Sequence, residues 1–355
     1  MQAESSLIWE ELDMDSVSVE LARLFPDIRF DGKEILSLLL QGQVWQAVKV
    51  LGSEITDVIN SQIGEFRTLF LVILILGITA AVFTHFADLF QNHQVSDVAF
   101  YFLYLLLITI LLRSYTSTLG TVKGVLEDIT TFMKLFIPTY MVAVGSAAGI
   151  STAGVYYPLL MVLVYLIEGG FLTVLLPAVS VFVLLTIING IWMEEKLTLL
   201  LELLEKVICG SVKITIGIIS GFSILQAMIA PVLDALQSSA LKKAVSSIPG
   251  IGGMTGGMME LVMGSAVLMK NSIGLYMTLL LFLICSVPLL KITLITIVIK
   301  LSAALIGIVS DKRMTNCADR VGNGTFMLLK IVISAIALFV IQIAVIMYST
   351  NQGIV

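Results

Sequence analysis

Beyond Arg67 the chain is a succession of apolar runs, and this pattern limits its fold more than any other feature of the sequence. A straight membrane-spanning helix needs about 20 apolar residues, and lipid offers the backbone N–H and C=O groups no partner outside the protein. Helices are therefore the expected form of each run. The runs are Leu69–Phe86, Val98–Leu112, Leu135–Ile150, Ala153–Ile167, Phe171–Trp192, Ile208–Leu233, Ile273–Leu290, Ile292–Val309 and Thr325–Tyr348. They predict an all-α, polytopic integral membrane helical bundle with about eight spans.

The composition also requires lipid as part of the solvent. Of the 355 residues, 58% are hydrophobic and 13% are charged, whereas an average soluble domain has about 25% charged residues. The net charge of −5 provides no basic footprint for nucleic acid. Three widely separated cysteines, Cys209, Cys285 and Cys317, show no Cys-x-x-Cys spacing, so neither a disulfide framework nor a zinc site is indicated. We expect the lipid bilayer as a partner, and neither nucleic acid nor a cofactor.

Residues 1–66 form a separate, acidic region in which Asp and Glu outnumber Lys and Arg by twelve to four. Asp31 and Glu34 have the spacing of a helix start, and apolar residues then recur at steps of three and four up to Phe66. This predicts a small acidic helical N-terminal head with one apolar stripe. Local packing of the stripe is favoured over docking on the membrane surface or on a partner. Residues 67–348 form the expected transmembrane domain, and 349–355 a short tail.

A second amphipathic segment is expected at residues 193–207. Leucines cover most of this helical wheel, and the remaining narrow strip is charged or polar. Such a helix fits the membrane interface or a subunit contact, of which the interface is favoured. The strip consists of Glu194, Glu195, Thr198, Glu202, Glu205 and Lys206.

The most distinctive segment is glycine-rich and runs from Ser246 to Gly274. Glycine clusters break helices, and irregular backbone at membrane depth is tolerated only against protein or beside a wet cavity. Glycines four residues apart also let helices approach closely. We therefore expect a re-entrant or broken element that serves a pore, a gate or a homo-oligomer interface. The candidate pore or helix-contact residues are Pro249, Gly250, Gly252, Gly253, Gly256, Gly257 and Gly264.

Signatures of an enzyme are missing. The sequence has no phosphate-binding loop and no Gly-x-Ser-x-Gly elbow, and His85 and His93 lack the spacing of a metal site. We expect no catalytic, cofactor-binding or metal-binding residues. Glu168, Glu260 and Lys270 are the ionisable residues expected at membrane depth, where charges line a pathway or pair with each other. A position at the membrane interface is the alternative for Glu260 and Lys270.

The glycine-rich segment resembles a known family. Pro249-Gly-Ile-Gly-Gly, followed by Gly264-Ser-Ala-Val-Leu-Met-Lys-Asn-Ser-Ile-Gly274, is similar to the stage III sporulation protein AE family of endospore-forming bacteria. The acidic head followed by many spans agrees with that family in layout. The resemblance implies a multi-pass protein of the mother-cell membrane surrounding the forespore. It would be a subunit, among other membrane subunits, of the secretion-like channel complex that joins the two cells and supports late forespore development.

The orientation of the head stays open at this stage. Lys and Arg residues outside the apolar runs gather mostly on the side of the N-terminus, which places the head in the cytoplasm. The first residues are polar and acidic, unlike a secretory signal. The family resemblance, however, implies an N-terminal signal and a head in the space between the two membranes.

Two other functions were weighed against a channel subunit. A stand-alone secondary transporter or permease would use Glu168 or Glu260 as its coupling carboxylate near broken helices. Comparison of the two halves of the chain reveals no inverted repeat, which disfavours this alternative. An intramembrane enzyme is the weakest hypothesis because no nucleophile and base are paired in the sequence.

Overall fold

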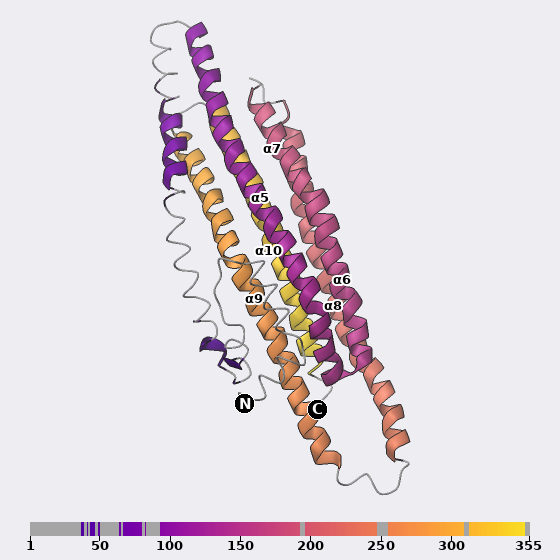
Figure 1. Cartoon of the computed structure of the whole chain (residues 1–355). Coiled ribbons are helices and arrows are strands. Elements are labelled where there is room, and N and C mark those ends of the chain that lie inside the picture. Colours follow the sequence, from indigo (N-terminus) through magenta and orange to yellow (C-terminus); the bar gives the residue numbers. More distant parts are fainter. Residues whose placement is uncertain are drawn as a thin grey trace.

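A computed structural model describes residues 93–191, 196–246, 255–308 and 312–351, together with 67–79 and a few positions between 37 and 82. All regular elements of these residues are helical, and the long ones lie side by side in a bundle (Figure 1). The element η1 is π-helical and joins α6 to α7 in one continuous rod. The elements are α5 (His93–Ala148), α6 (Ile150–Leu166), η1 (Ile167–Leu175), α7 (Leu176–Ile191), α8 (Thr198–Ser246), α9 (Thr255–Ile306) and α10 (Lys312–Ser349).

The all-helical membrane fold is confirmed in the described residues, whereas the expected count of about eight spans is not. Five helices there are long and apolar enough to cross a membrane. The described parts of the expected spans 153–167 and 171–192 form one rod, and 273–290 and most of 292–309 lie in α9. Leu135–Ile150 likewise falls largely at the end of α5 rather than in a helix of its own. The five candidates are Tyr101–Ala148, Ile150–Ile191, Thr198–Met228, Gly264–Ile306 and Lys312–Ser349.

These helices merge because nothing between the apolar runs stops a helix. A single charged residue such as Lys291 leaves the backbone hydrogen bonds intact, so α9 continues through it for 52 residues in total. At 1.5 Å per residue α9 is about 78 Å long, well beyond the roughly 30 Å hydrocarbon core of a bilayer. The apolar runs therefore mark membrane-compatible surface, and they do not mark the ends of helices.

At two of the places where the chain reverses direction, the structure shows a specific residue that supports the turn. Gly149 links α5 to α6 with φ 104°, a conformation that residues with a side chain rarely adopt. Ala153 lies opposite Gly145 at ordinary contact distance, so the Gly145-x-x-x-Gly149 pair serves this turn. At the other end of the rod, Asn189 of α7 accepts a hydrogen bond from the backbone N–H of Leu197 at 2.7 Å. That bond satisfies one of the amides that open α8.

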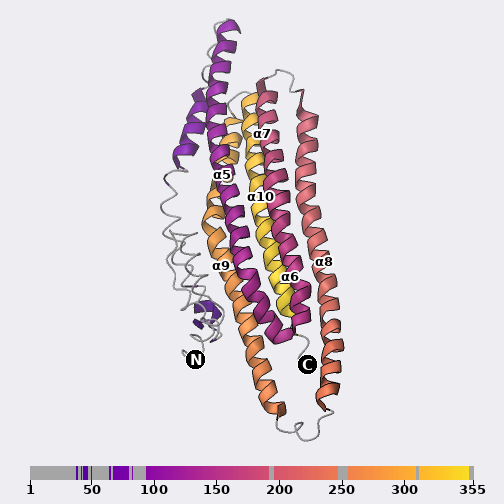
Figure 2. The same cartoon turned by 45° about the vertical axis from the view of Figure 1, so that its right-hand side comes forward.

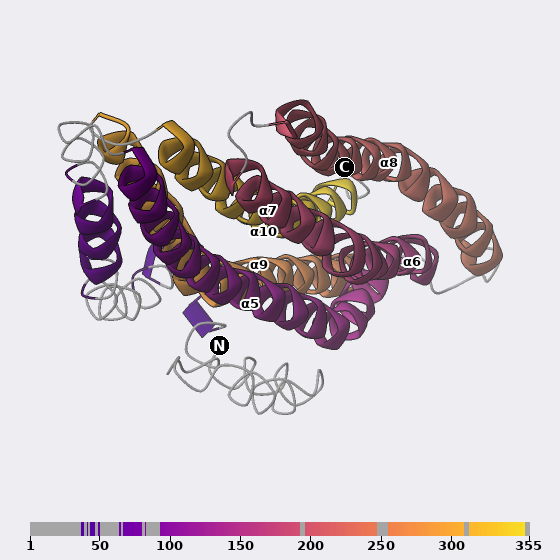
Figure 3. The same cartoon turned by 90° about the horizontal axis from the view of Figure 1, so that it is seen from above.

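The core is a continuous apolar cluster centred on α10, which contacts α5, α6, α7, α8 and α9. The view from above shows these helices arranged around α10 (Figure 3). Phe132 and Phe136 of α5 have ring centroids 4.6 Å apart, and Phe136 lies 6.2 Å from Tyr276 of α9. Helices in lipid gain little from the hydrophobic effect between them, so such close packing is what holds the bundle together. Helix α8 lies at the edge of the bundle (Figure 2).

The expected amphipathic segment at 193–207 is not a separate helix where it is described. From Thr198 onward it forms the first turns of α8. Leu201 is completely buried, whereas Leu199 is 81% exposed and Leu203 is 59% exposed. The exposed leucines fit lipid or a partner, and Leu201 fixes this end of α8 to the bundle.

The glycine-rich segment and the acidic head are described only in part. Helix α9 begins at Thr255, so the second part of the glycine-rich segment is helical up to Gly274. Residues 247–254 and most of residues 1–66 lie outside the described residues. The re-entrant or broken element and the acidic helical head therefore stay predictions.

The close approach of α10 to α7 depends on Gly324. A methyl group at this position would overlap Val183, which is completely buried and stiff at its β-carbon. We expect Gly324→Ala to destabilise the protein by about 1–3 kcal/mol through overpacking. The midpoint of thermal unfolding in detergent would measure this.

Gly217→Ala in α8 is the matched control, because an added methyl group there meets no atom within 4 Å. Its midpoint should stay unchanged or rise, since alanine is favoured over glycine inside a helix by about 0.5–1 kcal/mol. Equal midpoints for the two variants would contradict the packing role of Gly324.

Candidate functional site

The π-helical segment η1 carries the sequence Glu168-Gly169-Gly170. Short π-helical stretches are rare and often mark functional positions. A methyl group added at Gly169 would meet no atom within 4 Å, so this glycine is not needed for close packing. The hydroxyl of Thr173 donates to the carbonyl oxygens of Glu168 (3.2 Å) and Gly169 within the same segment. The segment thus keeps the rod continuous and carries a carboxylate at its first turn.

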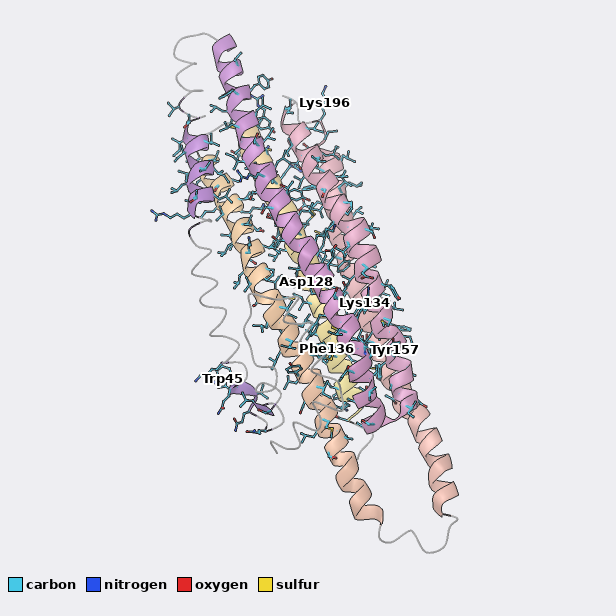
Figure 4. The ribbon with its side chains drawn as sticks, viewed as in Figure 1. Trp45, Asp128, Lys134, Phe136, Tyr157 and Lys196 are labelled. Atoms are coloured by element: carbon cyan, nitrogen blue, oxygen red, sulfur yellow. The ribbon has the colours of Figure 1, made fainter. Side chains whose placement is uncertain are left out.

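Glu168 forms an ion pair with Lys134 of α5. The Lys134 ammonium donates to Oε1 of Glu168 at 2.5 Å, and the two side chains are 44% and 35% exposed. Lys134 lies in the second half of α5, nearer to Ala148 than to His93 (Figure 4). Both residues belong to candidate spans, where an unpaired charge costs about 3 kcal/mol on insertion scales. The pairing neutralises two charges, but it leaves both on the outer surface of the bundle.

Lys270 of α9 is completely buried. Its ammonium donates to Oγ1 of Thr350 at 2.5 Å and to Oδ1 of Asn351 at 2.8 Å. These two acceptors follow directly after the last residue of α10. A cation is favoured at a helix C-terminus because unsatisfied carbonyl groups give that end a partial negative charge. Lys270 therefore ties the end of α10 to α9.

The remaining candidates from the sequence are only partly described. Pro249, Gly250, Gly252 and Gly253 lie outside the described residues, and the surroundings of Gly256, Gly257 and Glu260 are outside them too. Among the described residues, an added methyl group at Gly264 would meet no atom within 4 Å, so this glycine is not required there by close packing. Glu168 and Lys270 lie on different helices with different partners. A pore or helix-contact role of the glycines stays a prediction.

Several polar contacts between helices were not anticipated from the sequence. Lys300 of α9 pairs with Asp319 of α10 at 2.6 Å. Farther along α10, the ammonium of Lys330 lies 3.7 Å from the sulfur of Cys209 in α8. Within α10 itself it also lies 4.3 Å from the centroid of the Phe326 ring. Ser223 of α8 donates to Gln342 of α10, and both are completely buried. The residues that meet between different helices are far apart in the sequence, so no local pattern reveals these contacts.

A shallow hollow on the outer surface between α5 and α6 has a volume of about 740 Å³. Its walls are mostly apolar, and the hydroxyl of Ser146 donates to the carbonyl of Ala143 within α5. Specific small-molecule sites combine an apolar pocket with several convergent polar groups, which this hollow lacks. The lining residues are Pro138, Met141, Val142, Gly145, Ser146, Ile150, Ala153, Gly154 and Tyr157. In the part of the chain that the structure describes, no three His, Cys, Asp or Glu side chains are grouped to hold a metal ion.

The apolar helices and the charged groups between them define a helical multi-pass membrane protein. Comparison with known families then places it more narrowly. The family model of stage III sporulation protein AE matches residues 30–350, which is nearly the whole chain. The chain belongs to the stage III sporulation protein AE family, as the glycine-rich motif and the layout predicted.

One curated relative supports the same assignment. It is the stage III sporulation protein AE of Bacillus subtilis (strain 168), 22% identical over 282 residues, which cover 79% of this chain and 70% of the relative. No solved structure matches the chain. Family membership supports a role in sporulation.

The Lys134–Glu168 pair can be tested by exchanging its charges. Glu168→Gln leaves the Lys134 ammonium without its carboxylate at membrane depth, at a cost of about 3 kcal/mol on insertion scales. We expect less protein in the membrane fraction and fewer heat-resistant spores. The double variant Lys134→Glu with Glu168→Lys restores the pair and should recover both quantities, measured by immunoblotting and spore counts.

The exchange also separates the pair from a transport role. A coupling carboxylate must stay at its own position, so a transporter that uses Glu168 would remain inactive after the exchange even though the protein accumulates. Recovery of the protein without recovery of spores would contradict a purely structural pair.

The contact between Lys270 and the end of α10 predicts a local effect. Lys270→Met removes both hydrogen bonds, each worth about 1.5–3 kcal/mol when one partner is charged. The amides of Thr350 and Asn351 should then exchange with deuterium faster than in the unaltered protein, since the last turn is no longer tied to α9. Lys213→Met, which removes an exposed lysine of α8, is the matched control. Unchanged exchange in Lys270→Met would show that other contacts hold this end.

Proposed function

We propose that the chain is a non-enzymatic membrane subunit of the sporulation channel, a secretion-like complex that links mother cell and forespore and is needed for late forespore development. The observation that carries the proposal is the family match over residues 30–350, since the name of the family refers to stage III of sporulation. Five helices suited to a membrane agree with a subunit that is embedded in a bilayer. The membrane in question is, on this proposal, the mother-cell membrane around the forespore.

The way the described helices pack favours a subunit over a channel made by one chain. The centre of the bundle is filled by completely buried aromatic residues, among them Phe132, Phe136, Phe182 and Phe339. Protein interiors of this kind are close-packed and leave no room for a file of water molecules. A path that crosses the membrane would therefore run between chains, either other membrane subunits or further copies of this one.

The glycine-rich segment is proposed as a contact or pore element of that assembly. No atom of the described residues lies near the position of a methyl group added at Gly264, which leaves space for the backbone of another helix. Pro249, Gly250, Gly252, Gly253, Gly256 and Gly257 would extend the same surface.

Deletion of the coding sequence in the spore-forming host tests the proposal. Forespores should be engulfed and then fail in late development, and heat-resistant spores should be lost, because the channel would lack a required subunit. Fluorescence microscopy of the forespore and spore counts measure both effects. Re-expression of the intact chain is the control and should restore sporulation. A normal yield of spores from the deletion strain would reject the proposal, and the stand-alone transporter would then be the better reading.

A further inference from the structure

One face of α5 is polar along the middle of the helix. From Arg113 to Lys134 no apolar side chain of α5 is exposed. The exposed positions recur at steps of three and four residues, so they lie on a single side of the helix. We refer to them as the polar face of α5: Arg113, Thr116, Ser117, Gly120, Lys123, Glu127, Thr131 and Lys134.

The polar face carries charges of both signs and ends at apolar surface. Lys123 lies 3.7 Å from Glu127, with side chains that are 64% and 54% exposed, and η1 adds Glu168 beside Lys134. Beyond one end of the face, Phe102 of α5 is 67% exposed, and beyond the other end Val142 is 64% exposed. From Arg113 to Lys134 the helix rises about 32 Å, which is close to the roughly 30 Å hydrocarbon core of a bilayer.

Other helices expose apolar side chains at the same level of the bundle. Along the rod formed by α6, η1 and α7, this level extends from the hydrogen bond between Tyr115 and Ser180 to the Lys134–Glu168 ion pair. Between these contacts Val174 of η1 is 62% exposed, and Val181 directly beside Ser180 is 48% exposed.

Helices α9 and α8 expose the same kind of surface there. Tyr276 of α9 packs on Phe136, and Lys300 lies against Gly322 of α10, close to Gly324 and Tyr115. Between these two contacts α9 exposes Phe282 and Ile297. On α8, between the contacts of Cys209 and Ser223 with α10, the exposed side chains include Ile214 and Ile218, with Lys213 as the charged exception. At this level the exposed surfaces of the other helices are suited to contact with lipid, whereas the polar face of α5 is not.

We infer that the polar face of α5 lines an aqueous path between copies of this chain. Charged side chains in membrane segments face a wet cavity or another protein, because exposure to lipid is costly. The path lies between chains, since the centre of the described bundle is filled by apolar side chains. A face that carries Lys123 beside Glu127 and Lys134 beside Glu168 is complementary in charge to another copy of itself, which suits a symmetric assembly.

This inference adds a location to the proposed channel role, yet its test does not depend on that role. Water access and contact between copies are measured on the protein in the membrane, whereas the channel role is read from spores. The labelling test can therefore fail although deletion of the coding sequence abolishes sporulation. It can also succeed although deletion leaves the yield of spores unchanged.

Cysteine labelling in membranes tests the polar face. Thr116 and Thr131 are replaced one at a time by cysteine in the full chain, with Cys209→Ser as background, since Cys285 and Cys317 are buried. Val181→Cys and Ile297→Cys are the matched controls at the same level on α7 and α9. The probe is a membrane-impermeant methanethiosulfonate, which reacts with thiolate. Thr116→Cys and Thr131→Cys should react at least about tenfold faster than the controls, because a thiol ionises in water and not in lipid.

Contact between copies is read from the same variants. Oxidation with copper phenanthroline should link two copies of Thr131→Cys into a disulfide-bonded dimer, and should not link Ile297→Cys. Reaction of Thr116→Cys and Thr131→Cys as slow as that of the controls would overturn the aqueous path. Fast reaction without any linked dimer would overturn the assignment to copies of this chain and would point to a different protein as the opposite wall.

Discussion

The bundle depends on the close packing of every other long helix against α10. In a bilayer the surrounding lipid tails are as apolar as leucine, so helices associate through dispersion contacts and hydrogen bonds rather than through expulsion of water. Gly322 and Gly324 make this packing possible, because the stem of Lys300 lies over one and Val183 lies over the other. Without a side chain at these two positions, α9 and α7 can both approach the same stretch of α10. Helices α5, α6 and α8 also contact α10 directly.

The polar contacts of the bundle follow from that packing. Lys300 can reach Asp319 because Gly322 lets the lysine stem lie flat on α10. Lys270 reaches Thr350 and Asn351 because α9 and α10 run antiparallel, so that the end of α10 lies beside α9 at Lys270. Each of these contacts supplies a partner for a charge inside apolar surroundings, which is the condition under which membrane segments tolerate ionisable residues. The Lys134–Glu168 pair meets the same condition while remaining on the outside of the bundle, and it is this position that connects it to a surface shared between chains.

Family membership describes the process in which the protein takes part, and the structure describes how its helices pack. The family places the chain in sporulation. The described helices have a filled centre, a surface that is largely apolar and one polar face, which together suit a wall component better than a self-contained pore. In the proposed channel the chain would contribute a wall, and the assembly would contribute the opening.

The sequence by itself determined the class of the protein, because apolar runs of this length admit only helices in a bilayer. It also identified the family, since the glycine-rich motif is distinctive. Glu168 and Lys270, which were expected at membrane depth, lie within candidate spans, and their depth stays a prediction. Among the described residues it did not predict which apolar runs merge into one helix. Hydropathy marks the surface that lipid accepts, whereas backbone hydrogen bonding decides whether a helix continues through Lys291 or through Glu168-Gly169-Gly170.

The partners of the charged residues were decided by the tertiary structure alone. Lys134 and Glu168 are 34 residues apart, and Lys270 and Thr350 are 80 apart, so no helical period links them. The same holds for the polar face of α5: its spacing is present in the sequence, but its exposure depends on which side of α5 the other helices cover. Local periodicity is a property of one helix, whereas burial and pairing are properties of the packed bundle, and only the latter determine which polar groups are available to a partner.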